Sequence, residues 1–219
     1  MKITDLIYPE NLYCLCCGDT MQQNRVHGIC DSCASRIHWL YENPYKSIMD
    51  EFSFSDVISC CRYGFFERKI MNALKTGGKP YTAKGPALLM AERARFSGKQ
   101  FDLIVPVPIH KNKLAKRGYN QAELLADVIS KELGIPSVNA LLKITETKSM
   151  RSSGGMERRL LLDGSFAADP ECRELMRSKR ILLVDDVVTT GSTADSCSRV
   201  LLAEGAAEVS VLCFASASS

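Results

Sequence analysis

The sequence has little that points to a membrane or to secretion. No apolar run in it approaches the ~18 residues that a membrane-spanning helix needs. Its first residues, MKITDLIYPENLY, contain acids and a proline where a secretory signal peptide carries its apolar stretch. Positive and negative charges nearly balance, because the net charge is only +3 over 219 residues. This small excess does not by itself indicate a nucleic-acid or membrane partner. These absences favour a globular protein in the cytoplasm.

Cysteine, by contrast, is plentiful and clustered. Five of the ten cysteines fall between positions 14 and 33, and thiols that stay reduced in the cytosol more often bind metals than form disulfides. The stretch CLCCGDTMQQNRVHGICDSC holds two C-x-x-C pairs, Cys14 with Cys17 and Cys30 with Cys33. Two such turns supply four sulfurs for the closed tetrahedral coordination of a structural Zn²⁺ ion.

Two other side chains are possible alternative ligands for the zinc ion. Cys16 could replace Cys14 or Cys17 if the loop geometry changed, and His27 is the other possible ligand. A redox C-x-x-C motif or plain buried thiols is the alternative to zinc, although paired motifs are a stronger metal signal than one. We predict a cysteine-rich zinc-binding module over residues 1–42. Its fold would depend on the metal, because about 35 residues cannot build a core alone.

Residues 43–219 alternate between strand and helix patterns. Strands are predicted at 56–64, 101–108, 138–145, 179–186 and 208–216, and helices at 66–78, 87–96, 120–134 and directly after TTGST. A basic loop, IHKNKLAKRG, follows VPVP, and a polar excursion, ETKSMRSSGGMERRLLLDGSF, precedes strand 179–186. The alternation predicts a largely parallel sheet covered by helices on both faces, with ligands bound beyond the carboxyl ends of the strands.

The stretch ILLVDDVVTTGST, residues 181–193, is the best candidate for a binding site. Asp185 and Asp186 follow four apolar residues, and a glycine flanked by hydroxyls then leads into a helix. The free N–H groups and the dipole of a helix start favour an anion, so the hydroxyl loop is predicted to hold a phosphate monoester. The carboxylates would repel that phosphate and are predicted to accept hydrogen bonds from vicinal sugar hydroxyls. A capped turn with solvated aspartates is the alternative, and the missing Gly-Lys-Ser/Thr ending excludes a P-loop.

This stretch resembles the phosphoribosyl diphosphate (PRPP) signature of type I phosphoribosyltransferases across all thirteen residues. The wider order of motifs is similar to that of the ComF family, from about residue 14 to 214: a cysteine-rich start, ALKTGG, VPVP with a basic loop, RGYNQAELLA, ERR and the signature. The resemblance implies an α/β fold, in which a type I phosphoribosyltransferase-like domain at 43–219 follows a small zinc-ribbon module.

The resemblance also implies roles for individual residues. Asp185 and Asp186 would bind the ribose hydroxyls of PRPP. The loop from Val107 to Arg117 would lie near the diphosphate and its Mg²⁺, with Lys75 adding positive charge. Magnesium suits such a site because it usually sits among phosphate oxygens and waters with few protein ligands. The PRPP-binding set is then Asp185, Asp186, Val187, Val188, Thr189, Thr190, Gly191, Ser192 and Thr193.

The resemblance leaves three functions open. An active phosphoribosyltransferase would need a general base, for which Glu157 is a candidate only by its place in the polar excursion, and Leu160 stands where the family tends to have asparagine. A protein that handles single-stranded DNA, as the family's role in natural transformation implies, would use a basic patch with one aromatic residue. In the third function, the zinc module docks on a competence helicase or a DNA channel. The residues of the basic patch are Lys111, Lys113, Lys116, Arg117 and Tyr119.

Overall fold

The computed structural model describes residues 13–21, 26–76, 80–145 and 164–217. Some predicted features lie outside these ranges and are not considered further. They are the glycine pair at 77–78 that was expected to cap a helix, Glu157, Leu160, and all but the last residues of the polar excursion.

A four-stranded parallel sheet forms the centre of the molecule, in the order β1-β6-β5-β2. Its strands are β1 (Asp56–Arg62), β2 (Leu103–Pro106), β5 (Arg180–Val188) and β6 (Glu208–Ser216). The two central strands are buried over most of their length, as expected for apolar runs that are covered on both faces. The predicted parallel α/β sheet is confirmed.

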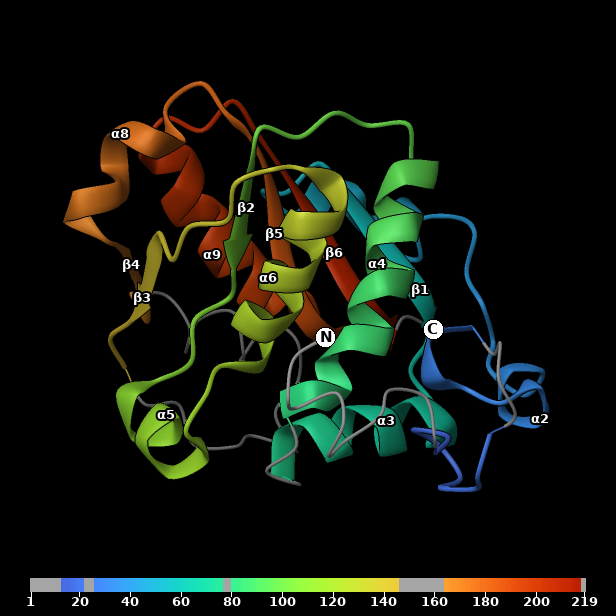
Figure 1. Cartoon of the computed structure of the whole chain (residues 1–219). Helices are drawn as coiled ribbons and strands as arrows, with labels where there is room; N and C mark the ends of the chain where they lie inside the picture. The colour runs from blue at the N-terminus through green and yellow to red at the C-terminus, as the bar shows by residue number, and fades with distance from the viewer. Residues whose placement is uncertain (1–12, 22–25, 77–79, 146–163, 218–219) are drawn as a thin grey trace.

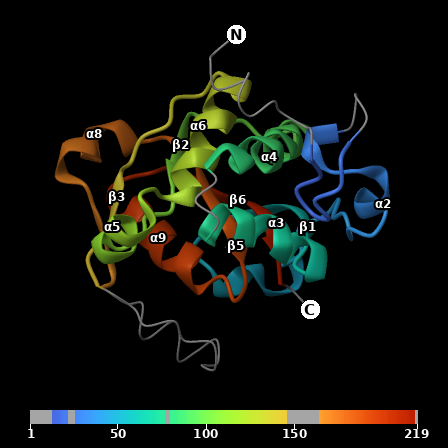
Figure 2. The same ribbon diagram turned by 60° about the horizontal axis from the view of Figure 1, so that its bottom comes forward.

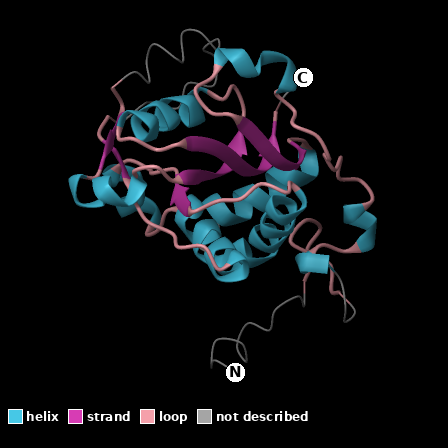
Figure 3. Ribbon diagram, turned by 90° about the horizontal axis from the view of Figure 1, so that it is seen from above, coloured by secondary structure: helices cyan, strands magenta, loops and turns pink. Residues whose placement is uncertain are grey.

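Helices cover both faces of this sheet (Figures 1 and 3). On one face, α3 (Phe65–Thr76), α4 (Lys84–Phe96) and α6 (Gln121–Leu133) share an apolar cluster with the sheet. On the other face, α9 (Ser192–Ala203) packs together with the segment that precedes β1. Figure 1 shows α4 and α6 in front of the strands and α9 behind them.

Two predicted segments differ in the structure. The strand expected at 138–145 is only β3 (Leu141–Lys143), which pairs antiparallel with β4 (Phe166–Ala168) and not with the main sheet. A single bridge from Ser137 to Ile104 reaches the edge of the main sheet. That edge strand is short, because the prolines of VPVP cannot donate ladder hydrogen bonds.

The basic segment after VPVP was expected to be a loop, and this prediction was wrong. Residues Lys111–Arg117 form helix α5, and the Nδ1 atom of His110 caps it by accepting a hydrogen bond from the N–H of Asn112, at 3.2 Å. Shorter elements complete the described chain: α2 (Asp31–Ala34), α8 (Arg173–Met176), and the 3-10 turns Val26–Gly28, Lys46–Glu51, Pro80–Ala83 and Pro170–Cys172.

The N-terminal segment packs against the sheet domain. Ile29 and Ile37 are buried in the same apolar cluster as α3 and α4. The N–H of Leu40 donates to the Cys60 carbonyl and the N–H of Arg62 to the His38 carbonyl, both at 2.9 Å, so this segment pairs with the free edge of β1. The apolar core is therefore continuous across the predicted boundary at residues 42 and 43, and the division into two domains stays a prediction. Among the described residues, no helix has the length and apolar character needed to cross a membrane.

Candidate functional site

The carboxyl ends of the strands lie where α3, α5 and the start of α9 meet, at the end of the sheet that Figure 2 turns toward the viewer. Strand β5 continues through both aspartates to Val188. Asp186 is only 5% exposed, and its Oδ2 atom forms an ion pair with the Nζ atom of Lys75 on α3. Burial lowers the pKa of Lys75, but the charge and hydrogen bond of Asp186 and the charge of Asp185 together outweigh burial and raise this pKa above the usual value. Lys75 therefore stays cationic and is held against Asp186 Oδ2.

Asp185 is directed to the other side of the sheet. Its Oδ1 atom accepts a hydrogen bond from the N–H of Asp186, at 2.8 Å. Burial and the neighbouring Asp186 charge raise the pKa of Asp185 well above its usual range. Its charge also acts on Cys197 of α9 and on Lys143 of β3. Since successive strand residues point to opposite faces, Asp186 meets α3 while Asp185 meets the α9 and β3 side.

The hydroxyl loop forms a tight turn into α9. Gly191 has a φ of 75° and precedes the first residue of the helix. Thr190 Oγ1 and Ser192 Oγ lie 2.9 Å apart and share a hydrogen bond. Thr189 is exposed, whereas Thr190 and Thr193 are half-buried. The turn thus offers an exposed hydroxyl beside the N-terminus of a 12-residue helix, which suits a phosphate group.

The loop after β2 lies beside the aspartates. The N–H of Val107 donates to the Val184 carbonyl at 2.8 Å, and the Val107 carbonyl accepts from Asn120 Nδ2 at 3.0 Å. Arg117 donates to Gln121 Oε1, so its guanidinium is held at the start of α6. Tyr119 donates its hydroxyl to the Leu74 carbonyl at 2.7 Å. RGYNQ therefore ties α5 and α6 to the ends of β2 and α3, and Tyr119 is a structural residue more than a free stacking surface.

The four paired cysteines form a compact cluster. The Sγ atoms of Cys14, Cys17, Cys30 and Cys33 all lie within 4.8 Å of one another. The Cys17 and Cys30 sulfurs are 3.8 Å apart, and two thiolates on one tetrahedral zinc ion at about 2.3 Å each would be separated by about 3.8 Å. Burial raises the pKa of Cys14, but the N–H groups of Cys30, Cys17 and Cys16 outweigh it and lower this pKa to about 6. The pKa values of Cys17 and Cys33 are instead raised to about 12, so it is the spacing of the four sulfurs that shows that the cluster could hold a zinc ion.

The two alternative ligands lie outside the four-sulfur cluster. The Cys16 thiol is directed at the Phe66 carbonyl of α3, 3.8 Å away. His27 Nε2 lies 3.0 Å from Glu92 Oε1 of α4. Neither side chain belongs to the four-sulfur cluster, and both attach the cysteine-rich segment to the helices of the main domain.

Gly85 at the start of α4 lies close to the backbone of the cysteine-rich segment. A Cβ atom at this position would lie 2.1 Å from the His27 carbonyl oxygen. In an unhindered helix, Gly→Ala stabilises by about 0.5–1 kcal/mol. We expect Gly85→Ala to lower the free energy of unfolding by roughly 2 kcal/mol, because backbone must move to relieve this overlap. Chemical denaturation checks the sign, and a stabilised variant would contradict the observed packing.

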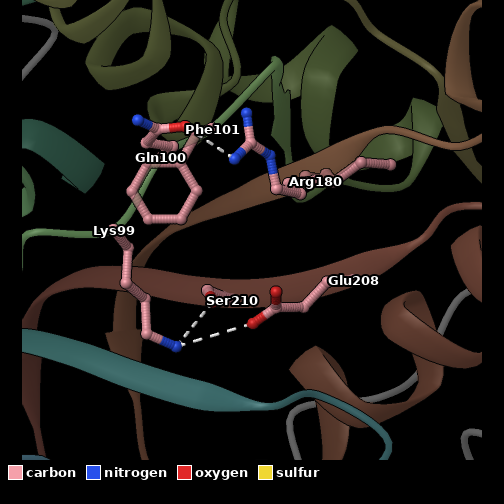
Figure 4. A pocket seen from close by; sticks show the side chains of 7 residues that line it. Lys99, Gln100, Phe101, Arg180, Glu208 and Ser210 are labelled. Carbon is pink, nitrogen blue, oxygen red and sulfur yellow. Dashed lines mark hydrogen bonds and ion pairs between the residues drawn. The ribbon is translucent and has the colours of Figure 1, made fainter.

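A pocket of about 190 Å³ lies at the opposite end of the sheet (Figure 4). It sits where β5 and β6 begin, and its charged side chains are paired: Arg180 with Asp102 at 2.8 Å and Lys99 with Glu208 at 3.6 Å. Ligands of parallel sheets bind at the carboxyl edge, so this pocket does not coincide with the predicted site. Its lining residues are Lys99, Gln100, Phe101, Arg180, Ile181, Glu208 and Ser210.

The sequence analysis missed several residues that shape the site. Tyr45 donates its hydroxyl to the carbonyls of Val188 and Thr189, and nothing local in the sequence signals a contact across 143 positions. Lys143 likewise reaches Asp185 only through the fold. The role of Asn120 could have been predicted, because asparagine directly before a helical pattern is a common N-cap. In the structure it caps α6 by accepting a hydrogen bond from the N–H of Ala122, at 3.1 Å.

No family model matches the chain, but it is similar to proteins named for competence and DNA utilization. Competence protein F from Haemophilus influenzae is 28% identical over 208 residues, which cover 91% of this chain and 82% of that protein. Competence protein ComFC from Bacillus subtilis is 27% identical over 208 residues, covering 89% and 73%. DNA utilization protein YhgH from Salmonella typhimurium is 33% identical over 128 residues, covering 58% of this chain and 54% of that protein.

Solved structures with a similar arrangement belong to enzymes named for phosphoribosyl chemistry. Glutamine phosphoribosylpyrophosphate amidotransferase from B. subtilis matches 59% of this chain and 26% of its own, with a TM-score of 0.42 and 21% identity. Purine phosphoribosyltransferase from Pyrococcus horikoshii matches 60% and 69%, with a TM-score of 0.36 and 22% identity. The similarity to the two competence proteins extends along about nine tenths of the chain, which also has the cysteine cluster and the parallel sheet. The chain is a homologue of competence proteins F and ComFC.

Proposed function

We propose that the chain binds PRPP with Mg²⁺ at the carboxyl edge of β5 and serves DNA handling related to competence. The observation that carries the proposal is the buried Asp186, paired with Lys75 beside the hydroxyl loop at the start of α9. A carboxylate that is buried at a strand end is costly unless an opposite charge compensates it. Here the compensating charge is a lysine, which can also attract a ligand's diphosphate.

In this proposal the ribose lies over the two aspartates and the 5′-phosphate lies against residues 189–193. Asp186 Oδ2 accepts a ribose hydroxyl, and the hydroxyl of Thr189 donates to the phosphate. The segment that starts at Val107 is beside Asp185 because Val107 is bonded to Val184. The diphosphate would lie between this segment and Lys75, with Mg²⁺ supplying charge neutralisation when bound.

The same arrangement would support transfer of the phosphoribosyl group to a nitrogen nucleophile. The nucleophile would attack the anomeric carbon as the diphosphate leaves, and the fixed positive charge of Lys75 would stabilise the departing anion. Binding and transfer are separable, so binding is the function to test first.

Calorimetric titration of PRPP with Mg²⁺ into the zinc-loaded protein tests the proposal. We expect binding by the parent and at least about 100-fold weaker binding by the double variant Asp185→Asn, Asp186→Asn, because each substitution removes a carboxyl group that the ribose hydroxyls would contact. Asp127→Asn, which changes an exposed carboxylate on α6, is the matched control and should bind like the parent. A folded, zinc-loaded parent that binds no PRPP would refute the proposed site.

Binding of single-stranded DNA is a second candidate, favoured by the exposure of α5. Its residues Lys111, Lys113 and Lys116 are all exposed, and the relatives are named for competence and DNA utilization. Such a surface would act on phosphates, and its affinity would fall steeply with salt. Fluorescence anisotropy of a labelled oligonucleotide over a salt series measures this, and an affinity that does not depend on salt would remove α5 as the contact.

A further inference from the structure

We propose that residues 43–55 form a brace that fixes the hydroxyl loop in its phosphate-binding conformation, with Tyr45 as the principal positioning residue. The ligand named here rests on the proposed function, whereas the fixing of the loop does not. The brace joins the cysteine-rich segment to β1 and passes across the start of α9 on the way.

Both ends of the brace are attached to the sheet. Asn43 Nδ2 donates to Asp56 Oδ1 at 2.6 Å, and the Oδ1 atom of the same asparagine accepts from the N–H of Tyr45 at 2.7 Å. At the other end, the N–H of Ser55 donates to the Val209 carbonyl at 2.8 Å. A segment attached at both ends can restrain whatever it contacts between them.

The first contact is polar and is made by Tyr45, which is 3% exposed. Its hydroxyl lies 3.2 Å from the Val188 carbonyl oxygen and 2.5 Å from the Thr189 carbonyl oxygen. Burial raises the pKa of this phenol, so it is a protonated donor at neutral pH. Carbonyl oxygens repel phosphate, and Tyr45 holds these two on the side of the loop that faces the brace.

The second contact is steric. The rings of Phe52 and Phe54 stack with centroids 4.7 Å apart, and Tyr45 meets Phe52 edge-on at 6.0 Å. Phe52 lies so close to Gly191 that a Cβ atom there would be 2.7 Å from its Cε1 atom. With a φ of 75°, Gly191 can turn the chain into α9 under this ring, where a side chain would not fit.

The third contact reaches the first turn of α9. Asp195 is 1% exposed, and its Oδ1 atom accepts from the N–H of Ser53 at 2.7 Å. Its Oδ2 atom accepts from Arg199 on the next turn, at 2.5 Å. The brace therefore holds the carbonyls before Gly191, the glycine itself and the helix after it, which are the parts that must be fixed for a phosphate site to be ready before the ligand arrives.

Hydrogen exchange in the ligand-free protein tests the brace without reference to PRPP. In Tyr45→Phe, which removes the hydroxyl and little volume, we expect amides in peptides that cover 188–195 to exchange about tenfold faster, while peptides from α4 and α6 stay unchanged. Tyr41→Phe, at a tyrosine that is 81% exposed, is the matched control and should exchange like the parent. Asp195→Ala, which cuts the third contact, should accelerate the same peptides. Exchange as slow in both variants as in the parent would overturn the brace.

Ligand affinity then separates positioning from a general loss of structure. Tyr45→Phe is expected to weaken PRPP and ribose 5-phosphate about tenfold, or ~1.4 kcal/mol. Binding of inorganic diphosphate with Mg²⁺, which does not need the 5′-phosphate loop, should be unaltered. Equal losses for both kinds of ligand, or none, would overturn the positioning role of Tyr45. If the parent itself binds neither PRPP nor ribose 5-phosphate, the proposed function fails, and the exchange rates still decide whether the brace exists.

Discussion

Cys17→Ala is expected to abolish stoichiometric zinc binding and to lower the thermal midpoint by about 10 °C. The purified parent should contain one zinc ion per chain, since four sulfurs within 4.8 Å of one another form a closed site. Cys17 is exposed, so its truncation removes a ligand without opening a cavity in the core. Structural zinc contributes ~10 kcal/mol or more to modules that cannot fold alone. Here packing on α3 and α4 retains part of that structure, and a loss of roughly 3–4 kcal/mol corresponds to about 10 °C in a chain of this size.

Cys16→Ala is the matched control, one position away. Its thiol donates to the Phe66 carbonyl and is not one of the four clustered sulfurs, so this variant should keep its zinc. Elemental analysis for metal content and thermal unfolding monitored by circular dichroism measure both effects. Loss of zinc from Cys16→Ala together with retention by Cys17→Ala would mean that the ligand set is wrong.

Breaking the ion pair between Lys75 and Asp186 is expected to lower the free energy of unfolding by about 3 kcal/mol. The side chains are 28% and 7% exposed, so removing either partner leaves a charge that water solvates poorly. Asp186→Leu and Lys75→Met should each show this loss in chemical denaturation. The double variant should recover most of it, because replacing both partners of a buried pair with apolar residues is often close to neutral.

The coupling energy from this cycle is the decisive quantity. We expect a coupling of about 2 kcal/mol or more, which is larger than the 0–1 kcal/mol typical of exposed pairs. Single variants that each cost less than about 1 kcal/mol would show that water screens the pair. PRPP titration of the same proteins gives an independent result, since the double variant should regain stability without regaining affinity.

Structural features that depend on neighbouring residues could be predicted from the sequence. Strands β5 and β6 were predicted almost to the residue, because uninterrupted apolar runs identify strands that are buried on both faces. The two C-x-x-C pairs gave the cysteine cluster, because each pair fixes its own sulfur spacing. The turn from β5 into α9 was likewise contained in thirteen consecutive residues. Helix α5 was missed because all of its residues are exposed or half-buried, so no apolar periodicity marks it, and histidine is an uncommon cap.

Which side chains meet at the site was decided only by the tertiary structure. Asp186 and Lys75 come from different elements, and their pairing follows from the packing of α3 across the end of the sheet. The Cys16 thiol contacts the Phe66 carbonyl of α3 and is not part of the four-sulfur cluster, and Tyr45 reaches the hydroxyl loop from 143 positions away. Local patterns record the preferences of a few neighbouring residues, whereas such contacts depend on how whole elements are placed by the burial of a shared core. The parallel sheet, the cysteine pairs and the loop into α9 thus follow from local sequence patterns, whereas the packing of the shared core sets which residues face one another around them.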